Sequence, residues 1–134
     1  MDKMVLAEIN GRQYPLHYSV DVMFEALDRF KDINTALDVI SGDGIAAFEA
    51  TQWLAVKLAN DGELCRREAG YEPVAMLQAS DITTRMTPIA FAALKSAVVD
   101  AILVGYGREV SDETGQERDL GLEELEAKKT MAGA

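Results

Sequence analysis

The sequence predicts an α+β domain in which an N-terminal two-stranded antiparallel β-hairpin packs on a mostly α-helical body. Two segments of alternating polarity flank Asn10-Gly11, the strongest short-range hairpin signal, because a type I′ turn needs positive φ at both central residues. Apolar residues then recur at three- and four-residue steps, which is the period of amphipathic helices. Since an isolated hairpin is marginally stable, we expect its apolar face to dock on those helices.

Pairing Ile9 with Arg12 fixes which hairpin side chains share a face, because successive side chains of a strand point to opposite sides. The inward face is then predicted to consist of Val5, Ala7, Ile9, Tyr14, Leu16 and Tyr18. The outward face is predicted to consist of Leu6, Glu8, Gln13, Pro15 and His17. His17 is therefore expected to be a solvated strand residue.

Two helices are expected between the hairpin and residue 41. Ser19 is a favourable N-cap for the first, which ends at Lys31-Asp32, and Asn34 is expected to cap the short second one. The core face of the first helix is predicted to be Val20, Met23, Phe24, Leu27 and Phe30. The second is expected to bury Ala36, Leu37 and Ile40. The sequence Ser-Gly-Asp-Gly at 41–44 then breaks the chain.

A longer helix is predicted over residues 45–59. Asn60-Asp61-Gly62 is expected to interrupt or kink it, and a polar helix follows over 63–68 until Gly70. A further short element is predicted over 74–78. The core residues of the long helix are expected to be Ile45, Phe48, Leu54, Ala55 and Leu58, with Trp53 beside them.

The last long helix is predicted over residues 89–104. Thr87 is its expected N-cap and Pro88 its first residue, where a missing N–H does no harm. Only Lys95, Ser96 and Asp100 interrupt its apolar sequence. A helix of this pattern is expected to be buried on most sides, either inside the domain or against a partner chain. We therefore expect the protein to form a homo-oligomer.

The length of 134 residues predicts one hairpin-plus-helices domain over residues 1–107, followed by an acidic tail over 108–134. Residues 111–119 contain no apolar side chain, so this part of the tail is expected to be flexible. Farther on, Leu120, Leu122 and Leu125 among acidic residues could form one or two turns of amphipathic helix, too short to be stable alone.

The composition argues against several classes of partner. Thirteen basic and 23 acidic residues give a formal charge of −10, which disfavours binding to nucleic acid and to anionic membranes. No apolar stretch is expected to reach the roughly 18 residues of a transmembrane helix, and no signal peptide is expected before the hairpin. The single cysteine, Cys65, excludes an intrachain disulfide. We expect a cytoplasmic protein.

No constellation of residues predicts catalysis, a cofactor or a metal site. His17 is the only histidine, and Cys65 is expected to be a partly buried helix cysteine, although Arg66-Arg67 beside it could lower a thiol pKa. The Gly-Asp-Gly at 42–44 lacks the lysine and spacing of a P-loop, so it predicts a turn. An enzyme would need a concave polar pocket that joins His17 or Cys65 to partners from elsewhere in the chain.

The ordered set of segments resembles the tail assembly chaperones of long-tailed (siphovirus-type) bacteriophages and prophages. No single motif is diagnostic, because each is a structural signal, and the resemblance depends on their order over residues 4–107. The matching segments are the motif Glu-Ile-Asn-Gly-Arg-Gln-Tyr-Pro-Leu at 8–16, the helix across 24–30, the long helix ending at 58–62, the stretch 66–73 and the closing helix with its glycines at 87–107.

The resemblance implies a non-enzymatic protein of the host bacterial cytoplasm. It would bind the tape measure protein, keep that long apolar helical chain soluble during tail assembly, use no cofactor and be absent from the mature virion. We place the expected binding groove between helices 45–59 and 89–104; the alternative is that these residues fill the core. The expected partner-binding residues are Trp53, Leu54, Leu58, Phe91, Leu94, Val98, Ile102, Leu120, Leu122 and Leu125.

Two further expectations remain open at this level. Ala127-Lys-Lys129 can be encoded by a slip-prone heptamer, and many members of the family are made in a second, longer form by ribosomal frameshifting. Such a form would recruit the tail tube protein, and the coding DNA of these three codons tests the idea. The alternative function is an acidic helical adaptor or regulatory module, such as another phage morphogenesis factor or a protein that masks a basic surface.

Overall fold

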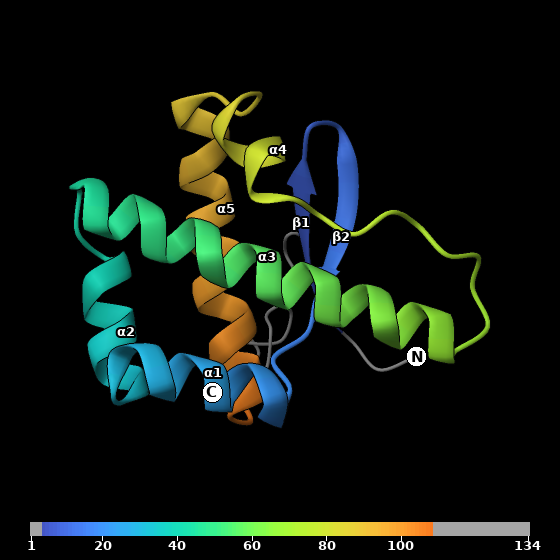
Figure 1. Cartoon of the computed structure of the whole chain (residues 1–134), viewed down its shortest axis with the longest axis horizontal. Coiled ribbons are helices and arrows are strands. Elements are labelled where there is room, and N and C mark those ends of the chain that lie inside the picture. Colours follow the sequence, from blue (N-terminus) through green and yellow to red (C-terminus); the bar gives the residue numbers. More distant parts are fainter. Residues whose placement is uncertain (1–3, 109–134) are drawn as a thin grey trace, which may run out of the picture.

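The hairpin appears as expected in the computed structural model, which describes residues 4–108 (Figure 1). Strands β1 (Val5–Ile9) and β2 (Arg12–Leu16) pair antiparallel, with Ile9 opposite Arg12. Asn10 and Gly11 have φ values of 55° and 83°, the left-handed conformation that a type I′ turn requires. The predicted turn and register are therefore confirmed.

The regular structure after the hairpin is helical within residues 4–108, which confirms the α+β class. They are α1 (Val20–Phe30), α2 (Ile33–Ile40), α3 (Ile45–Glu68), α4 (Ala79–Thr83) and α5 (Pro88–Gly105). Helices α3 and α5 cross one another, and the hairpin lies beside their crossing (Figure 1). Strand β2 contacts α3, whereas β1 contacts α5. The core lies where these four elements meet.

The hairpin is covered more completely than its alternation predicts. Ala7, Ile9 and Leu16 are buried as expected, but Pro15 is buried as well, which corrects its assignment to the outward face. The cause is the close approach of α3. A Cβ atom added at Gly62 would lie 1.8 Å from the Pro15 carbonyl oxygen. Both sides of the hairpin thus contact helices.

The predicted core face of α1 is right for Met23 and Phe30, which pack against the core, and wrong for Val20 and Phe24. Val22 and Ala26 are the buried positions, whereas Val20 and Phe24 are 60% and 62% exposed. The helix carries apolar residues on more than one side, so its period did not single out the side that packs. The Ser19 cap is confirmed, since its hydroxyl accepts from the Val22 N–H.

Helix α2 begins two residues earlier than its predicted Asn34 cap implies. Asp32 is the N-cap, and its carboxylate accepts a 2.7 Å hydrogen bond from the Thr35 N–H. This hydrogen bond holds the pKa of Asp32 below its usual value. An aspartate at this position also opposes the positive end of the helix dipole.

Helix α3 continues for 24 residues through the predicted interruption. Gly62 is required there by the contact with Pro15, and it does not break the helix. The polar side chains beside Gly62 form hydrogen bonds with other segments of the chain: Asn60 with Leu77, and Asp61 with His17. The short element predicted over 74–78 is also wrong, because residues 71–78 are extended and irregular and helix α4 follows at Ala79–Thr83.

Asn60 fastens this extended segment to α3. Its Oδ1 accepts a 2.7 Å hydrogen bond from the Leu77 N–H, and its Nδ2 donates a 3.1 Å bond to the Leu77 carbonyl. Asn60→Ala should lower the free energy of unfolding by about 1–2 kcal/mol, because both backbone groups lose their partner. Urea denaturation measures the change. Asn34→Ala, at an exposed position of α2, is the control, and equal losses in the two variants would contradict the prediction.

Helix α5 is buried on one side only, contrary to expectation. Leu94, Val98 and Ile102 face the core, whereas Ile89 is 83% exposed. The helix has a mean hydropathy of 1.7 over 18 residues, so by length and composition alone it could cross a membrane. The expectation that no segment reaches this length was wrong, because two charged residues lower the average too little. Core helices of globular domains meet the same criteria.

The last turn of α5 closes on the end of the hairpin. A Cβ atom at Gly105 would lie 2.5 Å from the Tyr18 ring, so only glycine allows this contact. The hydroxyl oxygens of Tyr18 and Tyr106 are 3.2 Å apart. Burial and this hydrogen bond raise the pKa of Tyr18. Residues 18 and 106, near the two ends of the described chain, are therefore in direct contact.

Candidate partner-binding surface

Half of the predicted partner-binding residues lie inside the molecule. Leu54, Leu58, Leu94, Val98 and Ile102 are each no more than 2% exposed and pack in one cluster with the hairpin. They fill the space between α3 and α5 where a groove was expected. The alternative, that these side chains form the core, describes them correctly. No partner could reach them without opening the fold.

Trp53 and Phe91 remain partly accessible, but on different surfaces. Trp53 packs edge-on against Phe30 of α1, with ring centroids 6.1 Å apart, and the Arg29 guanidinium lies 4.9 Å from its centroid. Phe91 packs on Phe48 of α3, with centroids 4.6 Å apart. Leu120, Leu122 and Leu125 lie outside the described residues.

Exposed apolar side chains lie in the first turns of α3 and α5, the two helices that the Phe48–Phe91 contact joins. Ile45, in the first turn of α3, is 76% exposed, and Ile89, in the first turn of α5, is the most exposed large apolar side chain of the described residues. We refer to Ile45, Phe48, Ile89 and Phe91, near the starts of α3 and α5, as the α5 surface. Ile45 is the first residue of α3 and Ile89 is the second residue of α5. At the end of a helix, a side chain can project beyond the neighbouring helix. The prediction that Ile45 belongs to the core is therefore wrong.

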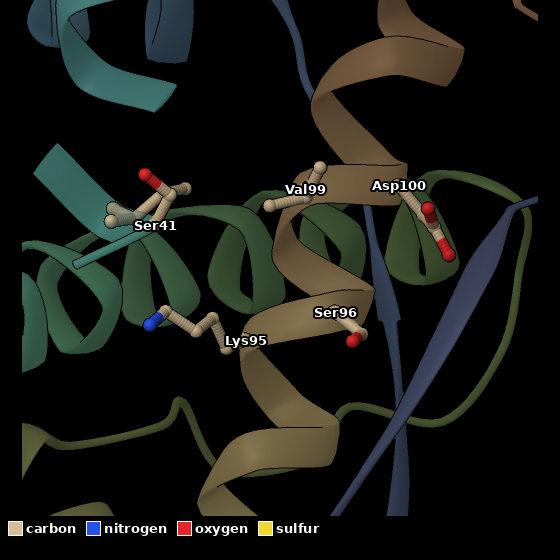
Figure 2. A pocket seen from close by; sticks show the side chains of 6 residues that line it. Ser41, Lys95, Ser96, Val99 and Asp100 are labelled. Carbon is tan, nitrogen blue, oxygen red and sulfur yellow. The ribbon is translucent and has the colours of Figure 1, made fainter. Parts of the chain in front are cut away.

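A shallow hollow of about 360 Å³ lies farther along α5, against the end of α2 (Figure 2). Lys95 and Val99 point toward Ser41, and Ser96 and Asp100 lie on the other side of α5. Lys95 Nζ donates a 2.6 Å hydrogen bond to the Gly42 carbonyl. Phe91, Lys95 and Val99 follow one another at four-residue steps, so the hollow and Phe91 lie along one side of the helix. Ile89, two residues before Phe91, projects from a different side.

The structure brings His17 and Cys65 together, which the sequence did not predict. His17 Nδ1 lies 2.6 Å from Asp61 Oδ2 and 3.4 Å from Cys65 Sγ. The backbone N–H of His17 also donates to the Leu58 carbonyl, so the residue lies against α3 and is only partly solvated. The Asp61 and Cys65 side chains both approach Nδ1 of the His17 ring. In a catalytic triad, the acid and the nucleophile contact different nitrogens of the histidine ring. The contact fastens β2 to α3.

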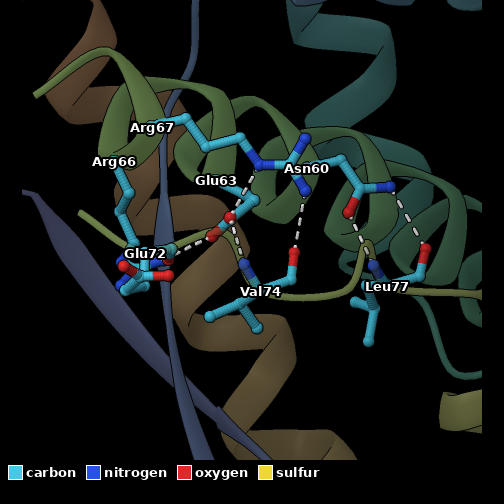
Figure 3. A network of polar contacts seen from close by, with 7 residues as sticks. All are labelled: Asn60, Glu63, Arg66, Arg67, Glu72, Val74 and Leu77. Atoms are coloured by element: carbon cyan, nitrogen blue, oxygen red, sulfur yellow. Dashed lines mark hydrogen bonds and ion pairs between the residues drawn. The ribbon is translucent and has the colours of Figure 1, made fainter. Parts of the chain in front are cut away.

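Glu63 is the centre of a polar network at the C-terminal end of α3 (Figure 3). Its buried carboxylate accepts bonds of 2.7 Å from the Val74 N–H, 2.7 Å from Arg66 and 2.9 Å from Arg67. Burial acts to raise the pKa of Glu63, but these bonds outweigh it and lower the pKa to about 2. The arginines also donate to the carbonyls of Glu72 and Val74. The network anchors the extended segment 71–78.

Within residues 4–108, no group of three or more histidine, cysteine, aspartate or glutamate side chains is placed to bind a metal ion. The α5 surface is therefore the feature of the described chain with the clearest capacity for interaction, because large apolar side chains there contact water. Comparisons with protein-family models, curated proteins and solved structures found no match to the chain.

Proposed function

We propose that this protein is a non-enzymatic phage tail assembly chaperone that binds the tape measure protein. The observation that carries the proposal is the α5 surface, where Ile45 and Ile89 extend into solvent from the first turns of the two helices that the Phe48–Phe91 contact joins. Exposed apolar patches of this kind are typical of interaction surfaces. The order of the hairpin and helices, which resembles that of the chaperone family, supports the choice of partner.

The chemistry of the surface suits an amphipathic helix as its ligand. Such a helix buries its apolar side chains at three- and four-residue steps against a complementary apolar surface. The formal charge of −10 would make complexes repel one another and so oppose their aggregation. The same proposal includes self-association through α5 and action in the host cytoplasm. It also includes a longer frameshifted form that binds the tail tube protein.

Co-expression with a phage tape measure protein tests this function. The native chain should keep that protein in the soluble fraction, and Ile45→Ser with Ile89→Ser should abolish most of the effect. Both side chains are exposed, so the double variant should fold, which circular dichroism checks. Val20→Ser with Phe24→Ser removes equally large exposed side chains from α1 and is the control. Equal loss in both double variants, or in neither, would contradict the proposal.

The net charge of −10 favours a second candidate, an acidic adaptor that masks a basic surface. Binding by charge should weaken strongly with rising salt, because ions screen exposed charges beyond about 10 Å at 0.1 M. Binding through the α5 surface should change little. Measuring the affinity for the captured partner at low and high salt separates the two functions.

A further inference from the structure

A second cavity, distant in sequence from the α5 surface, lies between the hairpin turn and α4. It has a volume of about 400 Å³ and is lined by Ile9, Asn10, Arg12, Tyr14, Ala75, Met76, Asp81 and Arg85. Figure 1 shows the tip of the hairpin beside α4. The Asn10 side chain donates a 2.8 Å hydrogen bond to the Asp81 carbonyl, which fixes the two walls relative to each other.

Two arginines from distant parts of the chain converge on this cavity. Arg12 begins β2, and Arg85 follows α4. Neither guanidinium forms an ion pair or a hydrogen bond among residues 4–108, although the chain carries 23 acidic residues. Arg85 lies only four residues after Asp81 in the sequence, yet an Asp81 carboxylate oxygen instead accepts from the Gln78 N–H at 2.9 Å. Donor capacity in the cavity is therefore unused within the described fold.

The lining indicates the chemistry of a ligand. A guanidinium presents a planar set of donors that matches a carboxylate bidentately. Ile9, Ala75 and Met76 provide apolar contacts for the carbon atoms that carry such a group. Asp81 and the formal charge of −10 oppose a doubly charged anion more strongly than a singly charged one. These features favour an acidic side chain with its neighbouring backbone over a phosphate group.

We propose that the cavity formed by the hairpin turn, residues 75–76 and α4 binds a glutamate or aspartate side chain of an acidic peptide segment in another polypeptide. Arg12 and Arg85 would contact the carboxylate, and the apolar lining would contact its stem. The site is separate from the α5 surface, and the inference does not depend on the proposed function. The cavity would give a protein with a negative net charge one local site that binds negatively charged groups.

The test uses the full ¹⁵N-labelled chain and a short end-blocked peptide in which two glutamates alternate with alanine and leucine. Titration should shift the NMR signals of Arg12, Tyr14 and Arg85 saturably. The matched peptide with glutamine in place of glutamate should cause no saturable shift. Arg12→Ala with Arg85→Ala should weaken binding at least about tenfold, because two charge-assisted hydrogen-bonding groups are lost.

The control is Lys31→Ala with Arg108→Ala, which removes the same two charges at exposed sites outside the cavity. Its affinity should stay close to that of the native chain. Equal binding of the glutamine peptide, equal weakening in both double variants, or shifts centred elsewhere would overturn the proposal. Inorganic phosphate that binds as tightly as the peptide would reduce the cavity to a general anion site. The NMR spectra of the native chain and the Arg12/Arg85 double variant can also be compared without peptide. A difference in the signals of residues 109–134 would identify the chain's own acidic segment as the ligand and would overturn the proposal.

Discussion

Gly62→Ala is expected to destabilise the fold by roughly 3 kcal/mol, at the upper end of the usual range for overpacking. The added Cβ would lie 1.8 Å from the Pro15 carbonyl oxygen and 2.7 Å from its carbon. These are backbone atoms, so no side-chain rotation can relieve the overlap, and β2 must move away from α3. The hydrogen bond from the His17 N–H to the Leu58 carbonyl would be lost with that movement.

The sign of this effect is diagnostic. In an exposed helix interior, alanine is more favourable than glycine by about 1 kcal/mol, so a stabilised Gly62→Ala variant would show that the contact with β2 is wrong. Gly44→Ser is the matched control. Its Cβ would meet no atom within 4 Å, and serine is a favoured residue at this N-cap position of α3. Thermal and urea denaturation of both variants measure the difference.

Glu63→Gln should lower the free energy of unfolding by about 2 kcal/mol at neutral pH, because charge-assisted hydrogen bonds are replaced by weaker ones. The native carboxylate accepts from one backbone N–H and from two arginines. A glutamine offers one acceptor oxygen, and its NH₂ group must face another donor. Glu68→Gln, at an exposed position of the same helix, should have little effect. Similar losses in the two variants would contradict this role for Glu63.

The same substitution should also change the acid sensitivity of the protein. The pKa of Glu63 is lowered from 4.5 to about 2 in the folded chain. A depressed pKa means that the carboxylate stabilises the fold fully above its unfolded value and that this contribution is lost as the pH falls from about 4.5 toward 2. The stability difference between the native chain and Glu63→Gln should therefore shrink from neutral pH to about pH 3. A stability difference that stays constant over this pH range would contradict the link between the pKa of Glu63 and the stability of the fold.

The elements that follow from local chemistry were predictable. Asn10-Gly11 determined the turn and register, and Ser19 and Thr87 marked two helix starts, because each signal acts through atoms only a few residues apart. The continuity of α3 was not predictable in this way. Asn60 and Gly62 favour a break by their own propensities, and only their contacts with Leu77 and Pro15 make the helix continuous. Those partners are distant in sequence.

The candidate surfaces show the same division. Periodicity located the apolar residues of α1, α3 and α5, but it did not decide which of them face water, since each helix has more apolar residues than one packing face needs. Phe24 and Ile45 were assigned to the core and are exposed, whereas Leu94 and Val98 were assigned to a partner and are buried. The cavity containing Arg12 and Arg85 joins segments 73 residues apart, so no local pattern indicates it.

The contact of Tyr18 with Gly105 and Tyr106 has a consequence for synthesis on the ribosome. Strand β1 packs on α5, which is the last described helix to leave the exit tunnel. The apolar side of the hairpin therefore has no α5 to cover it until nearly all of the described residues have been translated. Such non-local contacts slow folding and prolong the exposure of apolar surface. Chains stalled before residue 88 should accordingly be degraded or captured by general chaperones more readily than chains released after residue 108.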